Sequence, residues 1–147
     1  MKREEILDKI IEEQQRVIDN LQQSVDRYKT ASDLDEDDTS DPDDLARQTE
    51  AKDMQLRYEK MLAKEKQDMA FVQAEKNKSY TEAELGALIE TDKNYIFMAV
   101  PLPKLNVNGK EIFCISPEAP IFKKLKGKKI GDKVEMGVNT FEIKSIK

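Results

Sequence analysis

Hydrophobic residues in the first half of the chain recur at alternating steps of four and three, the spacing of a coiled-coil helix. Before residue 31 this row consists of Leu7, Ile11, Gln14, Ile18, Leu21, Val25 and Tyr28. After residue 50 a second, less regular row consists of Ala51, Gln55, Tyr58, Leu62, Glu65, Met69 and Val72. Neither segment has glycine or proline in its interior. The pattern therefore predicts two helices of similar length that pack as an antiparallel coiled-coil hairpin over residues 1–76.

The second half of the chain has the short apolar runs and turn residues of a β-sheet. We expect strands at Leu85–Ile89 and Tyr95–Val100, and a tight hairpin at Asn108-Gly109, where both residues tolerate positive φ. Two last strands are expected around Val134, Met136, Phe141, Ile143 and Ile146.

One short helix is predicted between these strands. Ser116 is expected to cap it, Pro117 to occupy its first turn, and Gly127 to follow its end. The fold class is therefore α+β: a helical hairpin, then a small antiparallel sheet domain with one helix over residues 79–147.

Composition narrows the functional classes. Charged residues make up 37% of the chain, which suits long exposed helices. The chain has no histidine, which excludes imidazole metal sites and histidine-based acid–base catalysis. Its one cysteine, Cys114, excludes an internal disulfide, fits a reducing cytoplasm and is expected to be buried. No apolar run approaches the roughly 20 residues that span a bilayer, so no membrane partner is expected.

Eight carboxylates gather in residues 31–44, which lie between the two predicted helices and are called the acidic tip below. Asp41 is suited to cap the second helix, with Pro42 in its first position and two acids in its first turn. Capping explains three of the eight carboxylates and leaves five. Two interpretations stay open: a solvated acidic loop with a helix cap, or a site that needs carboxylates to bind a cation.

The segment Ile115–Met136 resembles the signature of bacterial transcript-cleavage factors of the Gre type (GreA and GreB). A serine-proline pair, Ser116-Pro117, precedes the turn GKKIGDKV, residues 127–134, as in that family. Gre proteins have an N-terminal coiled-coil hairpin and an FKBP-like C-terminal domain, so the resemblance covers the whole predicted architecture. Their tip motif, Asp-x-x-acid, is matched by Asp41-Pro42-Asp43-Asp44, and the Ala-Lys pair that follows it is matched by Ala51-Lys52.

This resemblance implies a factor that binds RNA polymerase and inserts the acidic tip into the secondary channel. Asp41 and Asp44 would act in catalysis in trans and hold a Mg²⁺ ion shared with the polymerase, with Asp37 and Asp38 as further metal ligands. Ile121, Phe122, Lys123 and Lys124 would contact the polymerase. The factor would be a cytoplasmic monomer and no enzyme itself, and would meet nascent RNA and DNA only within the elongation complex.

Three alternatives remain beside this interpretation. The tip is more acidic than that of Gre proteins and contains Pro42, so it also resembles Gre-like homologues that inhibit polymerase. A coiled-coil adaptor with a chemically inert tip is the second alternative. A prolyl isomerase is the third, although the second half offers few aromatic residues for the pocket of such an enzyme.

Overall fold

The computed structural model describes residues 2–32 and 42–147. Its contacts divide the chain into two compact units. The hairpin unit is Gln14–Met69, and the sheet unit combines Met1–Glu13 with Ala70–Lys147. The change in sequence pattern placed the boundary between the two parts at residues 76–79. The contacts instead group residues 3–13 and 70–75, called the lower ends of the two long helices below, with the sheet.

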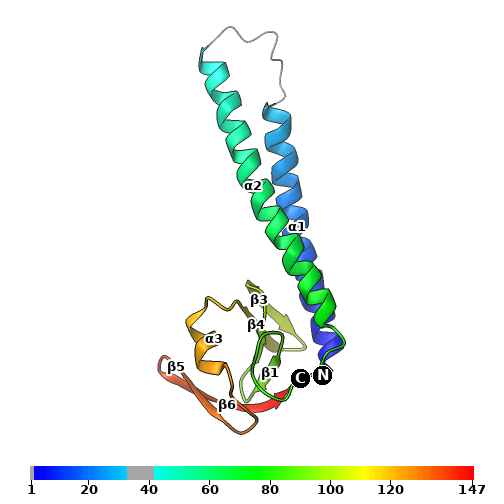
Figure 1. Ribbon diagram of the computed structural model, residues 1–147, viewed down its shortest axis with the longest axis vertical. Helices are drawn as coiled ribbons and strands as arrows, with labels where there is room; N and C mark the ends of the chain where they lie inside the picture. The colour runs from blue at the N-terminus through cyan, green and yellow to red at the C-terminus, as the bar shows by residue number, and fades with distance from the viewer. Residues whose placement is uncertain (1, 33–41) are drawn as a thin grey trace. The chain divides into compact units, whose positions relative to one another are not determined.

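The hairpin unit contains most of two long helices, α1 (Arg3–Ser32) and α2 (Pro42–Glu75), which run side by side in opposite directions (Figure 1). Their facing sides bury most of the apolar row that the sequence predicts, including Ile18, Val25, Leu62 and Met69. Near the far end of the pair, the rings of Tyr28 and Tyr58 stack with their centroids 5.5 Å apart. The helical hairpin is therefore confirmed.

Polar residues interrupt this apolar row at defined levels. Gln14 is fully buried, and its Nε2 donates to the backbone oxygen and the carboxylate of Glu65, at 2.9 and 2.6 Å. Buried polar groups at such positions favour one register of a helix pair over others. The Gln14–Glu65 contact therefore helps to fix which turn of α1 faces which turn of α2.

Replacing Leu62 by Asp should lower the melting temperature of the protein by several degrees, because a carboxylate would enter the apolar contact between the helices. Leu21→Asp should have a smaller effect, since Leu21 is only half-buried. Thermal unfolding followed by circular dichroism measures both. Unchanged melting of both variants would contradict the register described here.

The sheet unit contains one six-stranded sheet in the order β3-β4-β2-β1-β6-β5. The strands are β1 (Leu88–Thr91), β2 (Tyr95–Met98), β3 (Leu102–Val107), β4 (Lys110–Ile115), β5 (Lys133–Met136) and β6 (Asn139–Ile146). Neighbours pair antiparallel except β2 and β4, which run parallel. The α+β class is confirmed, with this parallel pair as the departure from a wholly antiparallel sheet.

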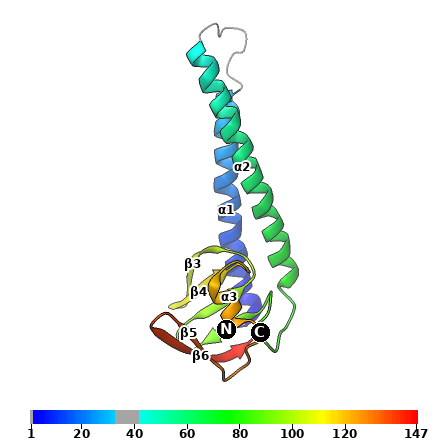
Figure 2. The same cartoon turned by 60° about the vertical axis from the view of Figure 1, so that its left-hand side comes forward.

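Two apolar clusters lie within the sheet unit. In the first, Ile6, Leu7 and Ile10 of α1 and Val72 of α2 pack with sheet residues such as Phe97. In the second, Phe122 and Leu125 of α3 (Pro120–Leu125) pack with other sheet residues, and Figure 2 shows this short helix against the strands. The lower ends of α1 and α2 thus complete one of the two apolar clusters of the sheet unit.

Two predicted boundaries are displaced for identifiable reasons. The prediction that Ser116 caps α3 is wrong: the cap position is Ala119, and Pro120 occupies the first turn. Ser116 instead accepts a turn hydrogen bond from Ala119 through its backbone oxygen. β1 begins at Leu88, three residues later than expected, because the chain turns at Gly86 with φ +98°. The turn at Asn108-Gly109 is confirmed, with positive φ at both residues.

Candidate functional site

The acidic tip is described only at its two ends. α2 begins at Pro42, as predicted, and Asp43 and Asp44 lie in its first turn. Asp44 is about half-exposed, and its Oδ1 lies 3.7 Å from Nη1 of Arg47, one turn further along. Asp41, Asp37 and Asp38 lie outside the described residues, so their predicted roles as cap or metal ligands stay predictions.

The last turn of α1 contacts α2 at Gln55, thirteen residues after α2 begins. Oγ of Ser32, the last residue of α1, donates to Oε1 of Gln55 at 3.2 Å. Nε2 of Gln55, which is itself buried, donates to Glu59 at 2.9 Å. Together with the Tyr28–Tyr58 stack, the Ser32–Gln55 bond joins the last turns of α1 to α2, whereas the bond to Glu59 lies within α2. Asp44 lies in the first turn of α2, eleven residues before this contact.

The described part of the tip offers a ligand of the type that a hard cation prefers. Mg²⁺ prefers oxygen ligands, keeps several waters and needs only one or two protein carboxylates, and Asp44 is an accessible carboxylate. Within residues 2–32 and 42–147, however, no three acidic or cysteine side chains gather into a metal site. A cation bound at Asp44 would therefore need further ligands from the rest of the tip or from another molecule.

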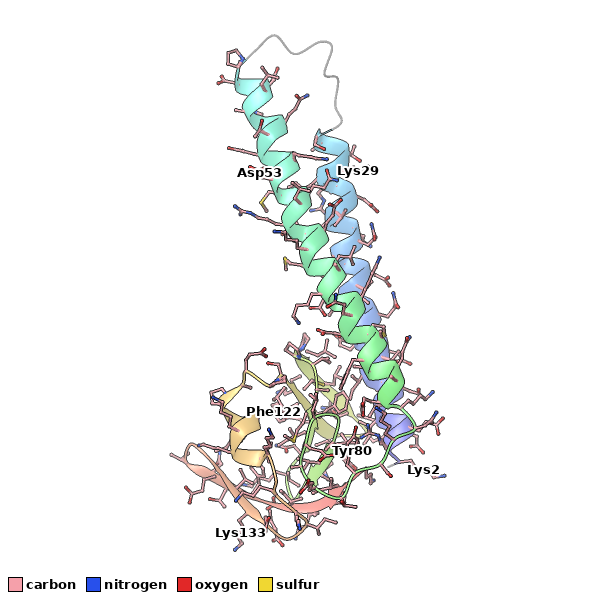
Figure 3. The ribbon with its side chains drawn as sticks, viewed as in Figure 1. Lys2, Lys29, Asp53, Tyr80, Phe122 and Lys133 are labelled. Carbon is pink, nitrogen blue, oxygen red and sulfur yellow. The ribbon has the colours of Figure 1, made fainter. Side chains whose placement is uncertain are left out.

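The residues predicted to contact polymerase lie on α3 and differ in accessibility. Lys123 and Lys124 are exposed, Ile121 is half-buried, and Phe122 lies in the second apolar cluster. The side chain of Phe122 (labelled in Figure 3) therefore stabilises α3, and the two lysines are better placed to meet a partner. Beside them lies a hollow of about 290 Å³, lined by Lys124, Lys128, Lys133, Val134 and Glu135.

A buried polar cluster, which the sequence analysis did not find, joins three distant parts of the sheet unit. The guanidinium of Arg3 donates to the backbone oxygens of Glu75 and Lys147, and its Nη2 lies 3.4 Å from the Glu75 carboxylate. The same carboxylate accepts hydrogen bonds from the Tyr80 hydroxyl and from Nζ of Lys78. Arg3 and Glu75 are almost fully buried.

The environment of this cluster determines its protonation. Burial, reinforced by the hydrogen bond to Glu75, raises the pKa of Tyr80 to about 12, so the hydroxyl remains a donor at neutral pH. Burial lowers the pKa of Arg3, while the charge of Glu75 opposes that shift. Gly86 is required beside the cluster, because a Cβ there would clash with the Glu75 carboxylate and the Tyr80 hydroxyl.

Two further expectations can be compared with the structure. Cys114 is buried, as predicted, and burial raises the pKa of its thiol to about 12, so it stays protonated and a poor nucleophile. Neither α1 nor α2, nor any other helix in the described ranges, combines the length and apolarity needed to cross a membrane.

Comparison with known proteins gives structural matches alone. No protein-family model matches the chain. No curated protein matches it either. One similar solved structure is the GreA factor homologue 1 (Gfh1) of Thermus thermophilus, with 16% identity and a TM-score of 0.35, over 98% of this chain and 94% of that one. Another is a structure of the transcription factor Gfh1, with 17% identity and a TM-score of 0.33, over 97% and 92% of the two chains. Both of these solved structures are of Gfh1, which the first of them describes as a GreA factor homologue.

Proposed function

We propose that this chain is a transcription elongation factor of the Gre type, which binds RNA polymerase and presents its acidic tip to the enzyme's active site. The observation that carries the proposal is a helical hairpin that has eight carboxylates within the fourteen residues 31–44, where α1 ends and α2 begins. A narrow helix pair can enter a channel that excludes a globular domain. The resemblance of the segment Ile115–Met136 to the Gre signature supports the same assignment.

In this function the chain supplies carboxylates, and the polymerase remains the enzyme. Asp41 and Asp44 would hold a Mg²⁺ ion together with the polymerase, and a bound Mg²⁺ would activate the water that cleaves a backtracked transcript. Clustered carboxylates repel one another in free solution, and a cation at the tip would offset that repulsion.

The second requirement is attachment to the polymerase. Lys123 and Lys124 present two exposed cations on α3, beside the hollow that Lys128 and Lys133 also line. Such a surface suits an acidic patch on the partner, because opposite charges speed association and fix orientation. Ile121 would add apolar contact at the edge of this surface.

The test is transcript cleavage by a stalled, backtracked elongation complex, with wild-type protein and the double variant Asp41→Asn/Asp44→Asn across a Mg²⁺ titration. Asparagine is itself a good helix cap, so the variant should fold normally and still compete with the wild type for polymerase. Its effect on cleavage should be lost, because two charges that recruit the cation are removed.

Matched substitutions in the same tip separate stimulation from inhibition. If the extra carboxylates hold the cation unproductively, neutralising Asp35, Glu36, Asp37 and Asp38 should convert an inhibitor toward a stimulator. A double variant at Asp41 and Asp44 with the full wild-type effect would refute a metal role and leave the tip a solvated loop. Absence of any polymerase binding by the wild type would refute the assignment itself.

A further inference from the structure

A hollow of about 590 Å³ lies in the sheet unit, beside the buried Arg3–Glu75–Tyr80 cluster. Three segments that are far apart in sequence line it: the start of α1, the connection after α2 and the end of β6. Lys2 and Tyr80 mark two of these segments in Figure 3. Its volume falls within the roughly 300–1,000 Å³ of small-molecule sites. The proposed polymerase-binding residues and the acidic tip are not among its lining residues.

The charge around this hollow is positive. Lys2, Arg3, Lys78 and Lys147 contribute four cationic side chains to its lining, and Glu5 contributes one carboxylate. A second carboxylate, that of Glu75, is buried and already engaged by Arg3, Lys78 and the Tyr80 hydroxyl. Glu84 also acts on Tyr80, so four positive charges stand against three negative ones around the hollow, and the remaining positive excess favours an anion.

Besides its cationic groups, the lining has an aromatic ring, an aliphatic side chain and a hydroxyl. Tyr80 presents an aromatic ring that lies 5.1 Å from the guanidinium carbon of Arg3, and Ile146 adds an aliphatic side chain. Ser79 contributes a hydroxyl that can donate to or accept from a ligand. An aromatic ring next to several cations suits a ligand that combines a planar ring with phosphate groups.

We propose that this hollow binds a nucleoside polyphosphate. Lys2, Lys78 and Lys147 contact the phosphates, and the base packs against Tyr80 and Ile146. Arg3 remains bonded to Glu75 and Lys147 and acts as the fixed edge of the site. The site is independent of the proposed action on transcripts, because it uses none of the tip residues.

The experiment is isothermal titration of the full chain with ATP in EDTA, so that no Mg²⁺ can bridge the nucleotide to the acidic tip. We expect one saturable site of submillimolar dissociation constant. Tripolyphosphate should bind more weakly because it lacks the ring, and adenosine should bind least because it lacks the charge. In ¹H–¹⁵N spectra, ATP should shift the signals of Tyr80 and Ile146.

Matched lysine variants separate a site from general electrostatic attraction. Lys2→Gln/Lys147→Gln should weaken ATP binding by about tenfold or more, because two charged contacts are lost. Lys128→Gln/Lys133→Gln removes the same charge at the other hollow and should change the affinity less than about twofold. No saturation at millimolar ATP, equal losses in both double variants, or equal affinity for ATP and tripolyphosphate would overturn the proposal.

Discussion

Glu75→Gln should lower the free energy of unfolding by about 3 kcal/mol, because removing one member of a buried ion pair leaves the other charge uncompensated. Glutamine keeps the size of the side chain, so the loss reports charge and hydrogen bonding rather than a cavity. The side chains of Glu75 and Arg3 are only 4% and 8% exposed, which limits the ability of water to replace the missing carboxylate. Urea denaturation followed by circular dichroism measures the change.

A surface ion pair provides the matched control. Nζ of Lys104 lies 3.0 Å from the carboxylate of Glu111, and both side chains are about half-exposed. Glu111→Gln should therefore lower the free energy of unfolding by less than about 1 kcal/mol. Similar losses from Glu75→Gln and Glu111→Gln would show that the buried cluster does not stabilise the sheet unit as described.

Phe97→Ala should lower the free energy of unfolding by about 3–5 kcal/mol, the usual cost of deleting a fully buried aromatic ring. Phe97 is fully buried on β2, in the cluster where Ile6, Leu7 and Val72 of the two helices meet the sheet. The vacated volume would weaken contacts of both helices and the sheet at once. Denaturant unfolding of the full chain measures the effect.

Phe113→Ala is the comparison for this substitution, since it removes the same ring from the neighbouring strand β4. Phe113 is only half-buried, so less apolar surface is lost and its effect should be clearly smaller. If both alanine variants had equal stability, the first apolar cluster would not be the main stabilising contact of the sheet unit.

Features that depend on neighbouring residues were predictable from the sequence. The rows that include Ile18 and Leu62 gave the two helices, because burial on one side of a helix repeats every three or four residues. Asn108-Gly109 gave the turn between β3 and β4, because few residue pairs adopt positive φ at both positions. The start of α2 at Pro42 was also predictable, because proline is favoured at the first position of a helix.

Features that depend on distant residues were not predictable. The parallel pairing of β2 and β4 arises because β3 lies outside β4 in the sheet, which no local pattern encodes. Arg3 and Glu75 are 72 residues apart, and each has the sequence context of an exposed helix charge. Gly86 was the one local signal of the buried cluster, since an isolated glycine near a strand can mark a close approach.

The wrong prediction for the start of α3 arose because two neighbouring residue pairs suit a helix start. Ser116-Pro117 and Ala119-Pro120 both offer a proline suited to a first helical turn, and the second pair is the one used. The acidic composition of the candidate site was predictable, since eight carboxylates fall within residues 31–44. Asp44, one of them, lies accessible in the first turn of α2. The roles of Asp41 and Asp44 as metal ligands stay predictions.

The hydrogen bond from Arg3 to the backbone oxygen of Lys147 has a consequence for synthesis on the ribosome. The sheet unit takes residues from both ends of this sequence. The bond between Arg3 and Lys147 therefore cannot form until residue 147 has left the exit tunnel. Residues 14–69 need no later segment to pair α1 with α2. We therefore expect the helical hairpin to form during translation, while Ile6, Leu7 and Ile10 stay exposed to chaperones until β4, the last strand of their apolar cluster, is released.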